Sequence, residues 1–247
     1  MLYDRILIIK IRFTKEGDYL KFVHIADVHF DSSFSGLRSN EYLVQKRKLE
    51  QREAFRKVID YIKQQNIEYF FISGDLYENE HVNTSTVEYI NRLFKEIPNT
   101  KIFISPGNHD PFIKESVYNT FKFADNVKII QSNKIEKYED EYVEIYGLGF
   151  EDFYMNECPL DNFHLIKSNK TQFLIMHADL NGINDIDGYS YNPINEIKLK
   201  KIGFDYVALG HIHKTNFSEN NRILYPGSLI SLGFDELGIH GMVTRKF

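Results

Sequence analysis

Five short polar motifs constrain this chain most, because each one directly follows a run of strand-forming residues. Runs of β-branched and aromatic residues are typical of buried strands. In open α/β sheets, functional sites form at the ends of such strands. The sequence therefore predicts an α/β fold in which polar side chains gather at one edge of a sheet. The motifs are Asp27-Val28-His29, Gly74-Asp75, Gly107-Asn108-His109-Asp110, His177 and Gly210-His211-Ile212-His213, and the runs before them span residues 22–26, 69–73, 101–105, 173–176 and 206–209.

Helical patterns alternate with these strands through the first half of the chain. From about Val127 onward the pattern changes to strands with few helices. A β-rich central sandwich with helices on both sides explains this order best. The predicted helices span residues 41–65, about 85–97 (ended by Pro98) and about 195–201, and the later strands span 127–130, 135–138 and 142–147.

The composition excludes several classes of protein. The 247 residues fit one large α/β domain, and 43% of them are hydrophobic, as in ordinary globular proteins. The formal net charge of −5 gives no support for a polyanionic partner, although it is compatible with a local basic track. Cys158 is the only cysteine, which excludes an intrachain disulfide and a thiolate metal cluster. No run resembles a signal peptide or a membrane span, so we expect a cytoplasmic protein without a membrane partner.

Residues 1–19 precede the first motif and its strand, and two interpretations of them stay open. Leu20 can be encoded by TTG, and Lys15–Asp18 can be encoded by purine-rich codons that resemble a bacterial ribosome-binding site. On that hypothesis residues 1–19 are a mis-annotated leader, which N-terminal sequencing of the native protein would test. The alternative is an extra edge strand over Arg5–Phe13. In both cases we expect the functional domain to span residues 20–247.

The donor set of the five motifs suits two divalent metal ions. Histidine nitrogen, carboxylate oxygen and an asparagine carbonyl make a mixed, fairly hard set, which favours Mn, Fe or Zn over copper or a calcium cage. Two such ions need a bridging anion to lie roughly 3.5–4 Å apart, and Asp75 is the candidate bridge. The remaining residues divide between the ions: Asp27, His29 and His213 serve the first, and Asn108, His177 and His211 serve the second.

The spacing within the motifs predicts how the ligands converge. In extended backbone, alternate side chains point to the same side. The pairs Asp27/His29 and His211/His213 can therefore each aim two ligands into one pocket. Glycine also accepts the positive φ of a sharp turn, and we expect this backbone at the glycine that begins each of three motifs. These glycines are Gly74, Gly107 and Gly210.

Such a site predicts hydrolysis of a phosphate ester. A water held between two ions loses a proton near neutral pH, because metals lower its pKa from about 15.7 to about 7. The resulting hydroxide would attack phosphorus in line while both ions neutralise the phosphoryl oxygens. We assign His109 to contact the phosphate and protonate the leaving oxygen, and Asp110 to orient and charge its imidazole.

As an ordered set, the motifs resemble those of the calcineurin-like metallophosphoesterase superfamily, from about Lys21 to the C-terminus. The resemblance implies a four-layer αββα sandwich with mixed central sheets, and it supports the ligand roles position by position. Protein Ser/Thr phosphatases of this superfamily carry an Asp-Arg-Gly segment after the bridging aspartate. Asp75–Glu80 lacks that segment, which argues against the phosphatase branch.

Longer segments resemble bacterial SbcD-type and YhaO-type DNA repair exonucleases, relatives of the Mre nucleases. That resemblance implies manganese-dependent cleavage of DNA phosphodiester bonds, an SMC-like ATPase partner of the SbcC or YhaN type, and a homodimer. Glu78 stands where many Mre-type enzymes have a histidine. We also expect no capping domain and no ATPase-binding helices in a chain that ends at Phe247. The segments that carry the resemblance are His24–Phe34, Tyr225–Ser228 and Gly233–Glu236.

Three functions stay open on the sequence. The leading hypothesis is a metal-dependent DNA exonuclease or endonuclease in DNA repair, and the alternative is a phosphodiesterase for small molecules such as cyclic nucleotides. A metal-free scaffold protein is disfavoured, because no expected ligand is missing. An open groove with a basic rim would favour DNA, and a lidded pocket would favour a small molecule. The basic residues that could follow a DNA backbone, or simply form a solvated face, are Lys46, Arg47, Lys48, Arg52 and Lys214.

Overall fold

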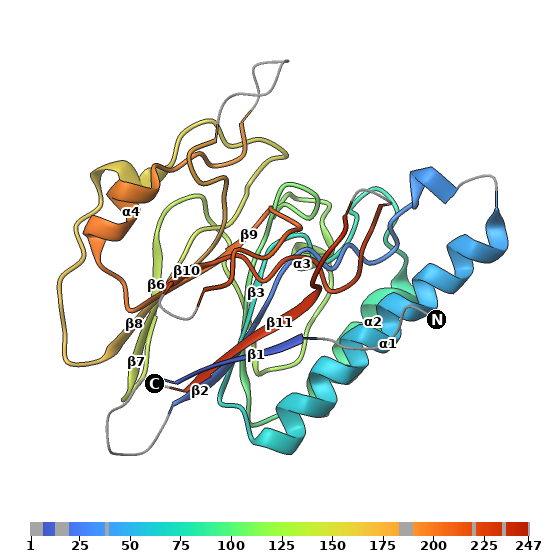
Figure 1. The fold of residues 1–247 in the computed structure, drawn as a ribbon, viewed down its shortest axis with the longest axis horizontal. Coiled ribbons are helices and arrows are strands. Elements are labelled where there is room, and N and C mark those ends of the chain that lie inside the picture. The colour runs from blue at the N-terminus through green and yellow to red at the C-terminus, as the bar shows by residue number, and fades with distance from the viewer. Residues whose placement is uncertain are drawn as a thin grey trace.

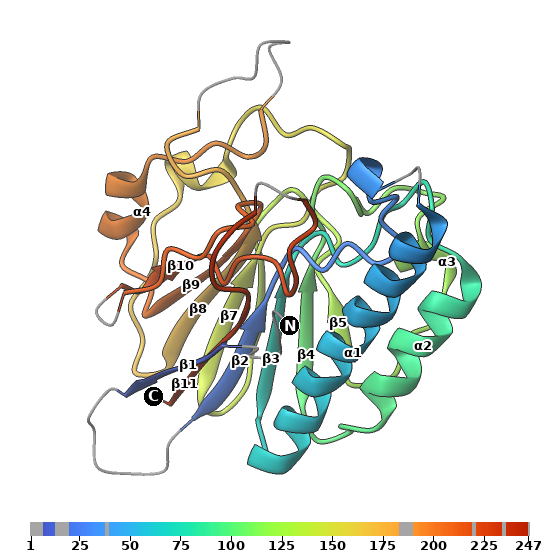
Figure 2. The ribbon, with the colours of Figure 1, turned by 45° about the vertical axis from the view of Figure 1, so that its right-hand side comes forward.

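Two β-sheets pack face to face at the centre of the computed structural model, and helices cover their outer faces (Figure 1). Helices α1 (Glu41–Gln65) and α2 (Thr84–Lys95) lie on one side, and α4 (Glu196–Ile202) lies on the other (Figure 2). This is the four-layer αββα arrangement with mixed sheets that the sequence predicted, so the fold prediction is confirmed. The structure describes residues 7–12, 20–37, 40–182, 190–218, 221–233 and 236–246.

The first sheet has six strands in the spatial order β1 (Leu7–Arg12), β11 (Gly241–Lys246), β2 (Lys21–Ile25), β3 (Tyr69–Ser73), β4 (Lys101–Ser105) and β5 (Val127–Ile129). Neighbours from β2 to β5 are parallel. Strand β11 is antiparallel to β2, and β1 is parallel to β11. The carboxyl ends of β2, β3 and β4 therefore meet at one edge of this sheet.

The second sheet has five strands in the spatial order β10 (Ile223–Leu224), β9 (Tyr206–Gly210), β8 (Thr171–His177), β7 (Val143–Gly147) and β6 (Glu136–Glu139). Neighbours from β10 to β7 are parallel, and β6 is antiparallel to β7. The carboxyl ends of β8 and β9 thus lie side by side, as those of β2, β3 and β4 do in the first sheet.

Strand β3 shows how the sequence builds the layers. All five of its residues are buried, as expected for a parallel strand that is covered on both faces. Phe70 and Ile72 pack into the core shared with α1 and α2, whereas Tyr69 and Phe71 pack toward the second sheet. The ring centroid of Phe71 lies 5.1 Å from that of Phe173 in β8. Alternate residues of one strand therefore serve two cores, and aromatic contacts hold the sheets together.

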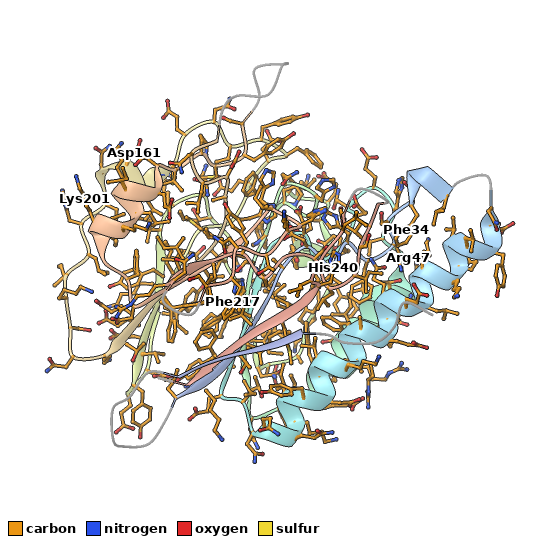
Figure 3. The ribbon with its side chains drawn as sticks, viewed as in Figure 1. Phe34, Arg47, Asp161, Lys201, Phe217 and His240 are labelled. Carbon is orange, nitrogen blue, oxygen red and sulfur yellow. The ribbon has the colours of Figure 1, made fainter. Side chains whose placement is uncertain are left out.

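The outer layer behind the second sheet is smaller. Leu199 of α4 is buried in a third apolar cluster on this face. Lys198 donates a hydrogen bond of 2.9 Å to Asp161 of η2 (Pro159–Asn162), which joins the two short helices. Asp161 and Lys201 mark this layer in Figure 3, far from α1. The second sheet is therefore covered by short helices and loops.

The predicted helices and strands agree with the structure apart from small shifts at their ends. The pattern did not predict the short elements η1 (Ser35–Leu37), η2 or α3 (Val117–Thr120). Strand β1 lies within the edge strand that one of the two interpretations placed over Arg5–Phe13. Residues 1–6 and 13–19 lie outside the described part of the chain, and the start of translation stays a prediction. Among the described residues, no helix has the length and apolar character needed to cross a membrane.

Candidate metal centre

The five predicted motifs meet at one edge of the sandwich, where strands β2, β3, β4, β8 and β9 end. Three overlapping groups of possible ligand atoms lie there, and within each group the atoms are no more than 4.8 Å apart. Strands far apart in the sequence thus deliver their polar residues to one place. The groups are Asp27/His29/His213, His29/Asp75/His109 and Asp27/Asp75/His177.

The backbone at these motifs differs from the extended path expected from the i, i+2 spacing. The φ angle is 51° at Asp27, 50° at His29, 53° at Asp75 and 109° at His211. A left-handed backbone costs an L-residue roughly 1–2 kcal/mol. Hydrogen bonds between loops hold it, from Asp27 N to Gly74 O at 3.1 Å and from His29 N to Asp75 O at 2.9 Å. Tight turns, rather than strand alternation, therefore aim the ligands.

Two histidines face each other in the first group of ligands. Nε2 of His29 lies 3.1 Å from Nε2 of His213, which is 4.0 Å from Oδ1 of Asp27. The Nδ1 atoms of the two rings contact Glu78 at 2.7 Å and Glu236 at 2.6 Å. A carboxylate acceptor keeps the imidazole proton on Nδ1, so both Nε2 lone pairs point to the same place. A cation would satisfy both, and these residues therefore fit a metal ion.

Asp75 lies between the two sets of nitrogen donors. Its Oδ2 is 3.5 Å from Nε2 of His29 and 3.3 Å from Nε2 of His177, and its Oδ1 accepts a hydrogen bond of 2.9 Å from the backbone of His109. Burial opposes ionisation of this carboxyl, but His177 and His29 outweigh it and lower the pKa of Asp75. An ionised oxygen that reaches both sets is in the position of a bridging ligand.

His177 is the centre of the second group. Its Nδ1 donates to the backbone oxygen of Ser73 at 2.9 Å, and its Nε2 lies 3.0 Å from Oδ1 of Asn108. The ring of His211 lies 5.2 Å from that of His177, and its backbone N–H donates to Asp27 at 3.0 Å. In the described ranges, the ring nitrogens of His211 join none of the compact groups. The structure therefore brings Asn108 and His177 together and places His211 beside them.

Glycines make room for this second group. A Cβ atom would lie 2.2 Å from Nδ1 of His177 if added at Gly74, and 1.7 Å from a backbone oxygen of β3 if added at Gly210. At Gly107 it would lie 2.3 Å from Oδ1 of Asp75. Of these three glycines, Gly74 alone has a positive φ, 84°. The expectation of positive φ was wrong for the other two, where the close approach of neighbouring atoms requires glycine.

His109 and Asp110 contact different partners, which corrects the expectation that Asp110 orients His109. Asp110 is fully buried, and its oxygens accept hydrogen bonds from the backbone of Asp75 at 2.9 Å and from the Tyr118 hydroxyl at 2.6 Å. Glu78 contacts the imidazole instead, with Oε2 at 2.8 Å from Nδ1 of His109. Asp110 therefore holds the turns around the site, because donors from those turns engage its carboxylate.

Glu78 connects His109 to the ligand His29. Burial opposes ionisation of this carboxyl, but its hydrogen bonds with His109 and His29 outweigh it and lower the pKa of Glu78 to about 2. Burial also opposes charge on His109, but Glu78 and Asp75 outweigh it and raise the pKa of His109 to about 9. The side chain of His109 is 45% exposed. An oriented imidazole thus reaches solvent at the edge of the candidate centre.

Glu78 and Glu236 are the site residues that the motifs did not reveal. Both were visible in other roles: Glu78 as a difference from Mre-type enzymes, and Glu236 as the end of the Gly233–Glu236 segment. Phe234 and Asp235 of that segment lie outside the described residues. The sequence motifs could not reveal these two roles, because each glutamate contacts a histidine from a distant part of the chain.

Two of the candidate DNA-contacting residues on α1 make internal contacts. Arg47 donates to the backbone oxygen of Ser231, and its guanidinium lies 5.9 Å from the ring centroid of Phe34 (Figure 3). Arg52 donates to the hydroxyl of Thr86 at 2.7 Å. For these two arginines the structure favours a role in packing α1 against nearby loops over a role in a basic track.

Comparisons with known proteins agree with this geometry. Residues 20–215 match the family model for the calcineurin-like phosphoesterase. The chain is 25% identical over 232 residues to "Uncharacterized metallophosphoesterase YhaO" of Bacillus subtilis (strain 168), an alignment that covers 90% of this chain and 56% of that protein. It is 24% identical over 253 residues to the SbcD subunit of the SbcCD nuclease of Staphylococcus epidermidis, with 88% and 63% covered. The chain thus spans between 56% and 63% of the length of these two relatives.

Because the family match extends over most of its length, the chain belongs to the calcineurin-like phosphoesterases, a family of binuclear metal-dependent hydrolases.

Proposed function

We propose that this chain is a binuclear metal-dependent phosphodiesterase that cleaves DNA, as an exonuclease or endonuclease in DNA repair. The observation that carries the proposal is the position of the Asp75 carboxylate. Its Oδ2 lies 3.5 Å from Nε2 of His29 and 3.3 Å from Nε2 of His177, and its Oδ1 accepts a hydrogen bond from the backbone of His109. The family supplies the phosphoester class. The name of one relative, part of a nuclease, supports DNA as the substrate.

Seven residues would hold the two ions. We propose Mn as the native metal, with Fe or Zn as alternatives, because the donors are imidazole nitrogens and carboxylate or amide oxygens. When bound, the ions supply an activated water and neutralise charge on the phosphoryl oxygens. Asp27, His29 and His213 would hold the first ion, Asn108, His177 and His211 the second, and Asp75 both.

His109 would act on the leaving group. Glu78 holds its Nδ1 at 2.8 Å, so Nε2 of this partly exposed ring is directed to the substrate. As the phosphorus–oxygen ester bond breaks, the leaving oxygen takes the proton from His109. Positioned acid catalysis of this kind contributes typically about 10²–10⁴-fold. The same Glu78 carboxylate contacts Nδ1 of His29 at 2.7 Å, so it positions both the acid and a ligand of the first ion.

The partners follow from the proposed activity. DNA is the substrate, and an SMC-like ATPase of the SbcC or YhaN type is the proposed protein partner, because one relative is named as a component of SbcCD. A homodimer and a cytoplasmic location complete the proposal.

A small-molecule phosphodiesterase is the second candidate, and one observation favours it. Glu151, Asp152 and Glu157 are exposed on the loop that follows β7, near the carboxyl edge of the second sheet. Acidic side chains repel a long polyanion more strongly than a small diester with one charge.

Hydrolysis by metal-stripped protein tests both candidates. Mn, Mg and Zn are added back in turn, with bis-p-nitrophenyl phosphate and with labelled single- and double-stranded DNA as substrates. We expect Mn-dependent cleavage of DNA that disappears in Asp75→Ala and His109→Ala. On the nitrophenyl diester, His109→Ala should keep more of its activity than Asp75→Ala, because nitrophenolate leaves without a proton.

The outcomes separate the candidates. Cleavage of the nitrophenyl diester and of cyclic nucleotides, but not of DNA, would favour the small-molecule phosphodiesterase. Equal losses in His109→Ala on both kinds of substrate would contradict the acid role of His109. Absence of hydrolysis with every metal would refute the proposed activity and favour a scaffold protein.

A further inference from the structure

A series of aromatic rings leads from the candidate metal centre to the protein surface. The ring centroid of His211 lies 5.2 Å from that of His177 and 5.0 Å from that of Tyr191. The next ring is Tyr154, 5.9 Å from Tyr191. The last two contacts are tilted by 36° and 38°, closer to stacking than the edge-to-face contacts frequent in the core. We call Tyr154 and Tyr191 the tyrosine pair.

Backbone contacts fix this pair relative to the ligands. Met155 and Tyr191 form an isolated parallel β-bridge, with hydrogen bonds from Met155 N to Ser190 O at 3.2 Å and from Asn192 N to Met155 O at 2.6 Å. Asn192 is buried, and its side chain donates to the backbone oxygen of His177 at 2.9 Å. The two segments that carry the tyrosine pair are therefore attached to each other, and the Tyr191 segment is attached to the strand end that carries a predicted ligand.

The surroundings of the pair favour contact with a base rather than with a phosphate. Tyr154 is 43% exposed, so much of its surface is open to solvent. The loop that carries Tyr154 also carries the exposed acidic residues Glu151, Asp152 and Glu157, which do not attract a phosphate backbone. Aromatic side chains stack on nucleobases without needing charge or a particular sequence.

We propose that Tyr154 and Tyr191 form a stacking site for a nucleobase of the substrate, next to the position where the metal ions would hold its phosphate. The proposal rests on the proposed function, because a nucleobase reaches this pair only when its own phosphate lies at the centre. It explains why an acidic rim accompanies a candidate nuclease site: affinity at this rim comes from stacking. The nucleobase belongs either to the end of a DNA strand or to a free nucleotide.

A binding experiment without turnover tests the stacking. The probe is an oligonucleotide with phosphorothioate linkages and a terminal 2-aminopurine, whose fluorescence falls when the base stacks, added to the full chain with Mn. We expect quenching by the wild type, about tenfold weaker binding to Tyr154→Ala, and retention in Tyr154→Phe, because stacking is worth about this much per base. Tyr142→Ala is the matched control, since Tyr142 is 63% exposed but precedes β7 at the opposite edge.

A kinetic comparison gives a second readout. Oligonucleotides that differ only in a terminal base or an abasic residue are cleaved by the wild type and by Tyr154→Ala. The variant should raise KM about tenfold for the oligonucleotide with the base, leave kcat nearly unchanged, and have little effect on the abasic one. A mononucleotide of 2-aminopurine in the binding experiment separates the two sources of the base: tight binding of it alone would identify a free nucleotide.

The results also separate this proposal from the proposed function. Equal quenching by the wild type and Tyr154→Ala, or equal KM changes on both oligonucleotides, would overturn the stacking site even in an active nuclease. Tyr154-dependent quenching in a protein that hydrolyses no phosphodiester would support the stacking site while refuting the nuclease. Loss of quenching in Tyr142→Ala as well would show that the effect is nonspecific and would overturn the proposal.

Discussion

Strands β3 and β4 carry polar groups at both of their ends, and the two ends are built differently. At the amino edge, the Tyr69 hydroxyl and the Lys101 ammonium both donate to Asp140, a residue of the second sheet's β6–β7 turn, and the Tyr69 contact is 2.6 Å. At the carboxyl edge, Asp75 and Asn108 follow the same strands, and their side-chain oxygens lie within 3.3 Å of Nε2 of His177.

The difference separates stability from function along one pair of strands. At the amino edge, two side-chain donors bind the Asp140 carboxylate. These polar groups are therefore satisfied within the protein, and their contact joins the two sheets. Lone pairs converge at the carboxyl edge, and left-handed residues such as Asp27 and Asp75 add strain. Sites that break local rules in this way are expected to be functional. A cation should therefore stabilise the carboxyl edge and leave the amino edge unchanged.

The largest expected effect is that of Asp75→Asn, which removes the bridging charge. Wild-type protein at a metal concentration of 100 times Kd should gain about 2.7 kcal/mol of unfolding free energy per site. Asp75→Asn should lose most of this gain and lower kcat/KM by about 10³-fold, because metal charge stabilisation is worth several kcal/mol. Urea unfolding with and without Mn measures the first effect, and hydrolysis measures the second. A variant that keeps the full metal gain would contradict the bridging role.

Gly74→Ala tests the second group of ligands, because the added side chain would meet His177. The added Cβ would lie 2.2 Å from Nδ1 of His177 at a φ of 84°. We expect about 3 kcal/mol lower unfolding free energy, from overpacking and left-handed strain together, and a metal content that falls from two ions to one. Gly203→Ala is the matched control, since its φ is 88° but its nearest contact is 3.6 Å. It should cost about 1 kcal/mol and keep both ions.

The local part of the site was predictable from the sequence, and the tertiary part was not. Strand runs followed by His, Asp and Gly are local signals, so the sandwich and the positions of Asp27 and His177 could be anticipated. The roles of Glu78 and Glu236 could not, because they depend on contacts across 49 and 23 positions of the chain. The assignment of Asp110 was wrong for the same reason: its proximity to His109 in sequence suggested a contact that the turn geometry directs elsewhere.

Glu236→Gln tests whether the two groups of ligands depend on different hydrogen-bond partners, a carboxylate in the first group and a backbone oxygen in the second. Glu236 holds Nδ1 of His213 at 2.6 Å, whereas Ser73 O holds Nδ1 of His177. Loss of such a partner typically weakens metal affinity about 10–100-fold. We expect the affinity to fall for the first ion only, and competition with a chelating dye would measure this change. Glu157→Gln removes the same charge from an exposed loop and should leave both affinities unchanged. Equal weakening of the two ions would contradict the division into two groups.

The smallest effect is expected at the amino edge, from Asp140→Asn. Burial opposes ionisation of Asp140, but hydrogen bonds from Lys101, Tyr69 and the backbone of Tyr142 and Val143 outweigh it and lower its pKa to about 2. A lowered pKa stabilises the fold above the unfolded value near 3.8, and this stability is lost as pH falls toward 2.

Asp140→Asn should therefore cost about 1 kcal/mol at neutral pH, a value kept small by solvent screening. Its unfolding free energy should also fall less than that of the wild type between pH 4 and pH 2, as urea unfolding across this range would measure. The variant should keep the full stabilisation by Mn and the full rate of hydrolysis, because the amino edge is complete without a cation. A loss of metal response in Asp140→Asn would show that the two edges are coupled through β3 and β4, and the separation of stability from function would then fail.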